Sequence, residues 1–196
     1  MSTERSTGDI TAGRPVGRFL HERLGGTPSV ARYYNVDESA SVIITTLADV
    51  PVPDWAIFST TGLSQAPNLL AGEDIRVELL ACARTGDDEM RNVLATCAFN
   101  VASSGWTAAP GVVFRDVITE YLPDATAPHM MWTEPFVAEG LGTATISEVG
   151  TIHWLQGVPL TSREVDYLDR YGFDALETRL ADADAEYFDL WRGSVC

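Results

Sequence analysis

Apolar residues recur along the chain at two spacings, and these spacings separate predicted strands from predicted helices. Short runs rich in β-branched and aromatic residues predict strands at residues 30–34, 41–47, 55–60, 76–84, 129–136 and 151–160. Spacings of three and four predict helices at residues 15–24, 87–104, 162–171 and 173–191. Because strands and helices alternate unevenly, we expect an α+β fold: a single domain with a mixed, mostly antiparallel sheet packed with helices.

The clearest local signal lies where the last predicted strand meets the following helix. Within residues 151–160, Ile152 and Trp154 share one face of the strand at period two. Thr161-Ser-Arg-Glu164 then forms a capping-box pattern, in which the Thr hydroxyl accepts from the amide of Glu164 and the Glu carboxylate accepts from the amide of Thr161. The pattern predicts a core strand that leads directly into a capped, acidic helix.

Length and composition favour one folded domain. The chain has 196 residues, 45% of them hydrophobic, which is enough for a single core. Residues 1–13 are polar and lack periodicity, so we interpret them as a flexible leader before a domain at residues 14–196. No apolar run reaches the roughly 18–20 residues of a membrane helix, and the N-terminus lacks an apolar signal core. The 3 Cys have no paired spacing, and together these features predict a cytoplasmic protein.

Acidic residues dominate the charge of the chain. The formal net charge is −15, and all 13 Lys+Arg positions are Arg. No Lys or Arg lies between Arg115 and Arg163, a segment that contains several acids. This distribution repels a phosphate backbone and so disfavours nucleic-acid binding. It favours fast association with a basic protein partner, but it would equally serve solubility alone, and the sequence leaves both interpretations open.

Motifs for catalysis are weak. The stretch Gly62-Leu63-Ser64-Gln65-Ala66 resembles the G-x-S-x-G nucleophile elbow, but Ala66 replaces the second Gly and a strand, not a helix, follows. A Ser hydrolase that uses Ser64 with His129 or His153 is therefore the least favoured function. The His and Cys residues lack the spacing of a zinc site, and no Gly-rich phosphate loop occurs. We therefore predict a protein that is not an enzyme and that binds no metal and no cofactor.

Four blocks, in order, resemble the suppressor of fused family. They are STTGLSQAPNLLAGEDIRVELLACAR (59–84), APGVVFRDVI (109–118) after the predicted helix and Trp106, HMMWTEPF (129–136) and IHWLQGVPLTSREVDYLDRYG (152–172). The likeness extends over residues 26–191. It implies the fold of the N-terminal lobe of suppressor of fused.

The resemblance also implies a function in protein binding. Animal members carry a further C-terminal domain and grip a short peptide of a Hedgehog-pathway transcription factor between two lobes. We expect only the first lobe here, so that clamp is not carried over. Single-lobed bacterial members are associated with polymorphic toxin systems and resemble immunity proteins, which bind and neutralise a cognate toxin. The alternative is a regulatory module that binds a peptide by adding a strand to an open sheet edge.

The partner-binding residues are expected on and beside the capped helix. At helical spacing, Val165 and Leu168 should point inward, and the acids between them should point outward. Two residues of the preceding strand are expected near an exposed edge. The expected partner-binding set is Glu164, Asp166, Asp169, Trp154 and His153.

Overall fold

The strand β10 (Gly150–Leu160) lies at the centre of the sheet in the computed structural model, which describes residues 8–35, 38–138 and 140–196. It pairs in parallel with β6 (Val77–Arg84) along one edge. Along the other edge it pairs antiparallel with β9 (Thr143–Ile146) and β8 (His129–Thr133). Every residue of β10 from Trp154 onward is buried, as expected for a strand covered on both faces.

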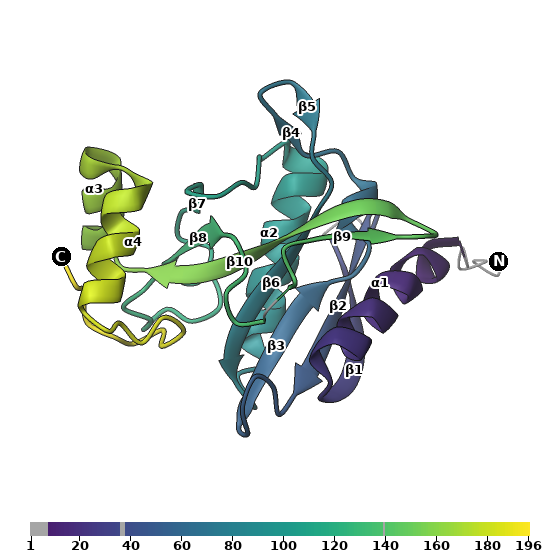
Figure 1. Cartoon of the computed structure of the whole chain (residues 1–196), viewed down its shortest axis with the longest axis horizontal. Helices are drawn as coiled ribbons and strands as arrows, with labels where there is room; N and C mark the ends of the chain where they lie inside the picture. Colours follow the sequence, from purple (N-terminus) through teal and green to yellow (C-terminus); the bar gives the residue numbers. More distant parts are fainter. Residues whose placement is uncertain (1–7, 36–37, 139) are drawn as a thin grey trace.

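The remaining strands extend the sheet on both sides of β10 (Figure 1). Within the described residues the order is β1-β2-β3-β6-β10-β8-β7, with β9 beside β10. All neighbouring pairs except β6–β10 are antiparallel. The further strands of this sheet are β1 (Thr27–Tyr34), β2 (Ser41–Ala48), β3 (Trp55–Thr60) and β7 (Val113–Phe114). A separate small hairpin contains β4 (Leu69–Leu70) and β5 (Glu73–Asp74).

Helices cover the sheet in three places. The helix α2 (Glu89–Ser104) packs on one face of the sheet, and α1 (Gly8–Leu24) packs on the other. At the end of β10, α3 (Ser162–Tyr171) and α4 (Phe173–Asp182) pack together beside β8. None of the helices in the described part of the chain is long and apolar enough to cross a membrane.

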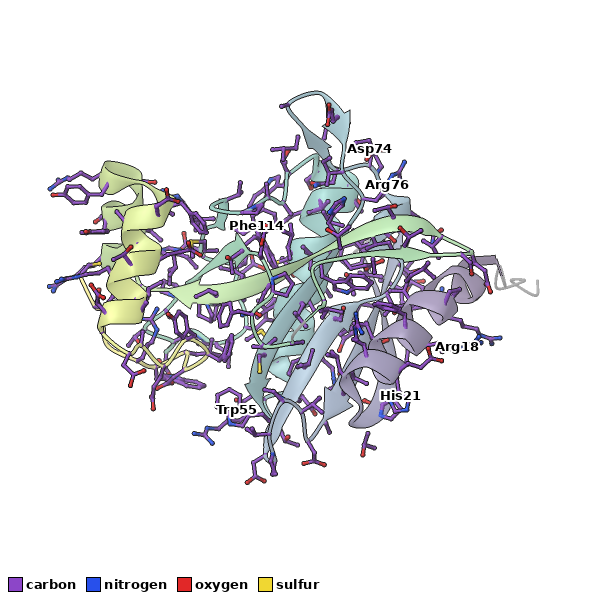
Figure 2. All side chains as sticks on the ribbon, viewed as in Figure 1. Arg18, His21, Trp55, Asp74, Arg76 and Phe114 are labelled. Atoms are coloured by element: carbon purple, nitrogen blue, oxygen red, sulfur yellow. The ribbon has the colours of Figure 1, made fainter. Side chains whose placement is uncertain are left out.

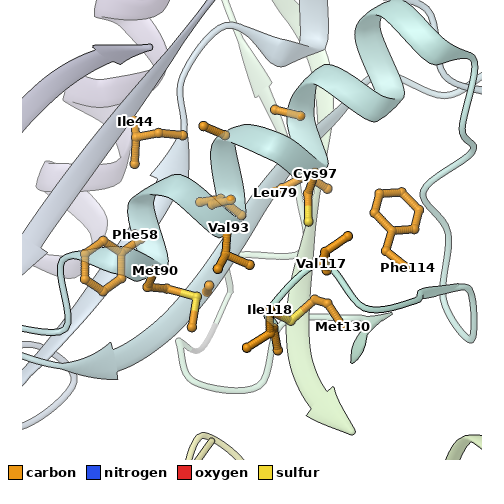
Figure 3. Close-up of a cluster of buried hydrophobic side chains, with 14 of the residues drawn as sticks. Ile44, Phe58, Leu79, Met90, Val93, Cys97, Phe114, Val117, Ile118 and Met130 are labelled. Carbon is orange, nitrogen blue, oxygen red and sulfur yellow. The ribbon is translucent and has the colours of Figure 1, made fainter. Parts of the chain in front are cut away.

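The largest core lies between α2 and the sheet, and Figure 3 shows part of it. Val93 and Cys97 of α2 are fully buried there, close to Leu79 of β6. Burial raises the pKa of the Cys97 thiol above its usual range, so Cys97 acts as a small apolar side chain. The helical stripe seen in the sequence is therefore the face that α2 buries.

The predicted α+β fold and all six predicted strands are confirmed, with ends that differ by a few residues. The predicted start and end of the helices need correction. The first helix begins at Gly8, with Pro15 inside it, so the leader expected at residues 1–13 is wrong from Gly8 onward, and its first seven positions lie outside the described residues. The last helix ends at Asp182. Residues 183–191 form turns instead, and Asp184 there has a φ of 48°, which is incompatible with a continuing helix.

Candidate partner-binding surface

Two of the expected partner-binding residues are buried, which corrects the expectation that they lie at the surface. Glu164 has an exposure of 0% because it closes the capping box and also binds Arg192. Trp154 lies under α1, where its ring stacks on Phe19 at a centroid distance of 5.4 Å. Its strand is central in the sheet and not at an exposed edge. Neither side chain can contact a partner in this structure.

The other three expected residues lie nearer to solvent but do not form one site. Asp166 and Asp169 are exposed on α3, as their helical spacing predicts. Asp169 is paired with Arg115, at 2.7 Å between Arg115 Nη2 and Asp169 Oδ2. His153 is half-buried on β10, with its Nδ1 at 3.0 Å from Thr143 Oγ1. Whether these side chains bind a partner stays a prediction.

Ser64 helps to fix the conformation of the loop that contains it. Its hydroxyl and its backbone N–H donate to Glu78 Oε1, at 2.7 Å and 3.1 Å. Glu78 also accepts from the N–H groups of Gly62 and Leu63 and from the hydroxyl of Thr60. Full burial raises the pKa of Glu78, while the hydrogen bonds from Thr60, Ser64 and Gly62 act against it. A buried carboxylate with five donors fixes the loop, and the hydroxyl of Ser64 is held in that network.

Within the described residues, titratable groups do not gather into a metal site. His129 Nδ1 accepts from the backbone N–H of Asp116 at 2.9 Å, and its Nε2 lies 3.2 Å from Ser162 Oγ. Burial lowers the pKa of His129, although the carboxylate of Asp116 acts against it. In the part of the chain that the structure describes, no three His, Cys, Asp or Glu side chains are grouped to hold a metal ion.

Aromatic rings meet at the surface near the ends of β3 and β8. Phe136 is 51% exposed. Its ring centroid lies 5.8 Å from that of Phe188 in a stacked arrangement and 5.2 Å from that of Tyr187 in an edge-on arrangement. Phe188 in turn contacts Trp55 edge-on at 6.1 Å, and Trp55 is visible at the lower end of the sheet in Figure 2. Trp191 is 49% exposed and lines the same region. We call Trp55, Phe136, Tyr187, Phe188 and Trp191 the aromatic surface.

Two cavities open on the aromatic surface, and Tyr187 lines both of them. The first, of about 400 Å³, lies between α4 and the strands β8 and β10. The second, of about 350 Å³, lies between Trp55 and the segment of residues 186–191. Exposed rings beside cavities are typical of protein-binding surfaces, because such rings bury much apolar area with little loss of conformational freedom.

Acidic side chains surround the aromatic surface. Glu177 lines the first cavity, and Asp87, Glu186 and Asp189 line the second. The one basic residue among the described residues that line either cavity is Arg84, whose guanidinium lies 5.1 Å above the ring of Trp55. Apolar rings inside an acidic rim fit a basic partner with an apolar centre.

The sequence contains a signal for this surface that the helical interpretation concealed. Residues 182–191 read DADAEYFDLW, in which acids are interleaved with three aromatic side chains. The helix predicted at residues 173–191 places Tyr187 and Trp191 on its apolar face, and so in a core. Because α4 ends at Asp182, the segment instead turns along the surface and presents Trp191 to solvent.

Comparison with known families identifies the protein's family. The model of the Suppressor of fused protein (SUFU) family matches residues 37–193, which is most of the chain. The chain therefore belongs to the suppressor of fused family, and the resemblance found in its sequence is confirmed. It is also similar to "Immunity protein YqcF" of Bacillus subtilis, with 32% identity over 183 residues that cover 92% of this chain and 95% of the relative.

Solved structures support the same fold. A suppressor of fused homologue from Neisseria gonorrhoeae matches with a TM-score of 0.73 and 14% identity, over 95% of this chain and 98% of that one. The suppressor of fused of Drosophila matches with a TM-score of 0.62 and 12% identity over 95% of this chain and 51% of its own length. A chain of a Sufu–Fu complex matches with a TM-score of 0.62 and 12% identity, over 96% of this chain and 92% of that one. At these identities the likeness establishes the fold.

Proposed function

We propose that this protein is a non-catalytic immunity protein that binds a cognate toxin domain and neutralises it. The observation that carries the proposal is the relative named as an immunity protein, which is 32% identical over 92% of this chain. A match of that extent covers most of the chain and not one motif. The net charge of −15 favours a basic toxin, because opposite charge accelerates association.

The aromatic surface is the proposed place of contact. It combines exposed rings, two cavities and an acidic rim, which are the features that concentrate binding energy in protein interfaces. The residues first expected for this role fit less well, since Glu164 and Trp154 are buried. Asp166 and Asp169 on α3 stay in the proposal as outlying acids that add to the attraction of a basic partner.

Co-expression tests the proposed role directly. If a gene beside this one encodes a toxin domain, that domain should stop growth when it is expressed alone, and co-expression of this protein should restore growth. The two purified proteins should elute together in gel filtration as one stable complex. Unchanged toxicity in the presence of this protein, or separate elution of the two proteins, would rule out the proposal.

A further inference from the structure

A second surface, away from α3 and α4, lies between α1 and the first two strands. A groove of about 370 Å³ is present there. One wall comes from α1, and the other comes from β1, β2 and the residue that follows β3. The lining residues are Gly13, Arg14, Gly17, Arg18, His21, Pro28, Val30, Ile43, Thr45 and Thr61. The helix can lie close to the strands because Gly13 has no side chain, and a Cβ at this position would collide with the carbonyl oxygen of Thr61. Longer side chains of α1 therefore form the rim of the groove.

That rim is basic in an otherwise acidic protein. Arg14, Arg18 and His21 follow one another at spacings of four and three, so they share one face of α1, and Figure 2 shows Arg18 and His21 on this helix. All three are exposed. Among the residues that the structure describes, Arg14 and Arg18 form no ion pair, and no acid lines the groove. The chain as a whole carries −15, so this local concentration of positive charge is a distinct feature.

The groove adjoins an open sheet edge. In the described part of the chain, β1 pairs with β2 and no strand pairs with its other edge. The N–H of Thr61 donates to the carbonyl oxygen of Ile43 at 3.0 Å, so the backbone N–H and C=O of Ile43 point away from β1. Arg32 lies opposite Ile43 in the β1–β2 register, and its own N–H and C=O therefore point toward the open edge. Because this orientation repeats at every second residue, the N–H and C=O of Val30 point the same way.

We propose that the open edge of β1 and the basic groove together bind an extended acidic peptide. The peptide adds as a strand and accepts hydrogen bonds from the N–H groups of Val30 and Arg32. Every second side chain of such a strand faces α1, at intervals of about 6.7 Å. Arg14 and Arg18 are four residues apart, so they are offset by about 6 Å along the helix. Acids at alternate peptide positions can therefore meet the two arginines in turn.

Charge favours this occupant over two others. A nucleic acid would be repelled by the net charge of −15. A second copy that paired through β1 would bring two sets of Arg14 and Arg18 together, which like-charge repulsion opposes. The proposed peptide site is separate from the aromatic surface and does not depend on the immunity function.

Fluorescence anisotropy tests the site with a labelled peptide of alternating Glu and Val, as long as the eight residues of β1. The wild-type protein should bind this peptide, and R14E/R18E should weaken binding by about tenfold or more. V30P should also weaken binding, because it removes an edge N–H that the β1–β2 ladder does not use. The matched control R163E/R170E makes the same charge change at two exposed arginines of α3 and should bind as the wild type does.

Hydrogen exchange of the wild-type protein gives a second measurement that needs no variant. Saturating peptide should slow exchange at the amides of Val30 and Arg32 and leave the exposed hairpin at Glu73 unchanged. The proposal is overturned if the peptide does not bind, if a Lys-Val peptide binds equally well, or if R163E/R170E weakens binding as much as R14E/R18E. Preferential binding of a single-stranded oligonucleotide at Arg14 and Arg18 would overturn it as well.

Discussion

Arg192 and Glu164 form a bidentate ion pair that is buried where the C-terminal segment meets the start of α3. The distances are 2.5 Å from Nη1 to Oε1 and 2.9 Å from Nη2 to Oε2, and the two side chains are 5% and 0% exposed. The same carboxylate accepts from the N–H groups of Thr161 and Val195 at 2.9 Å and 3.0 Å. Arg192 Nη2 also donates to the carbonyl oxygen of Pro159 at 2.9 Å. One carboxylate thus joins the capping box of α3 to the last residues of the chain.

Removal of Arg192 should destabilise the fold strongly. R192A leaves the Glu164 carboxylate buried without its countercharge, and breaking a buried pair in this way costs roughly 3–5 kcal/mol. Urea unfolding measures this loss as a change in the free energy of unfolding. The control R115A breaks the exposed pair between Arg115 and Asp169, which should cost about 1 kcal/mol or less. Equal losses in the two variants would contradict the structural role of Arg192.

The stability of the fold should depend on pH through Glu164. Burial by itself raises the pKa of Glu164, but hydrogen bonds from Arg192, Thr161 and Val195 and the charge of Arg192 together hold the pKa below its ordinary value of 4.5. A carboxyl with a lowered pKa in the folded state stabilises the fold fully above the unfolded pKa, and this stabilisation disappears as the pH falls through the folded pKa. We therefore expect the free energy of unfolding to fall as the pH drops below 4.5.

The variant E164Q isolates this contribution from the titration of other acids. It should be less stable than the wild type near neutral pH, and the difference should shrink in acid as the wild-type carboxyl takes up its proton. Urea unfolding at several pH values follows both proteins. A stability difference that stays constant through the acid range would show that Glu164 does not titrate with a lowered pKa.

The capping box shows what the sequence could predict and what it could not. Thr161 and Glu164 are three residues apart, so their reciprocal hydrogen bonds were predicted from the local pattern and are confirmed. Arg192 lies 28 residues beyond Glu164, and no local rule connects the two. For that reason Glu164 was expected to face outward, whereas Val165 and Leu168 were correctly expected to face inward.

The candidate surface was harder to predict for a related reason. Trp55, Phe136 and Phe188 come from distant parts of the sequence, and they meet because the start of β3 and the end of β8 lie near the segment after α4. Periodicity reports which face of an element is apolar, but it does not report whether another element covers that face. Trp154 is the opposite case: from the sequence it is expected near an exposed edge, but α1 covers it through Phe19.

Glu78 should hold the loop at Gly62–Ser64. E78A leaves three backbone N–H donors without their acceptor, and each buried unsatisfied donor costs about 1–3 kcal/mol. Hydrogen exchange at the amides of Gly62, Leu63 and Ser64 should accelerate, and the free energy of unfolding should fall. The control E73A changes an exposed acid in the β4–β5 hairpin and should alter neither measurement. Unchanged protection of these amides in E78A would contradict the role of Glu78 as an anchor.

Trp154 and His153 are adjacent in sequence but should respond differently to truncation. W154A opens a cavity beneath α1 and should lower the free energy of unfolding by roughly 3–5 kcal/mol. H153A removes a half-buried side chain that is hydrogen-bonded to Thr143, and it should leave stability within about 1 kcal/mol of the wild type. Thermal or urea unfolding separates the two. A comparable loss in H153A would show that His153, too, is part of the scaffold.

Binding of a toxin domain should depend on the aromatic surface rather than on exposed apolar residues in general. F136A/W191A removes two exposed rings, and loss of such residues from the centre of an interface costs about 2 kcal/mol or more, a weakening of roughly thirtyfold. The control Y171A/L69A removes two side chains that are 56% and 59% exposed elsewhere and should bind normally. Titration calorimetry with the toxin domain measures both variants. Because the rim is acidic, raised salt should slow association while dissociation changes little. Equal weakening by the two double variants would place the contact elsewhere on the protein.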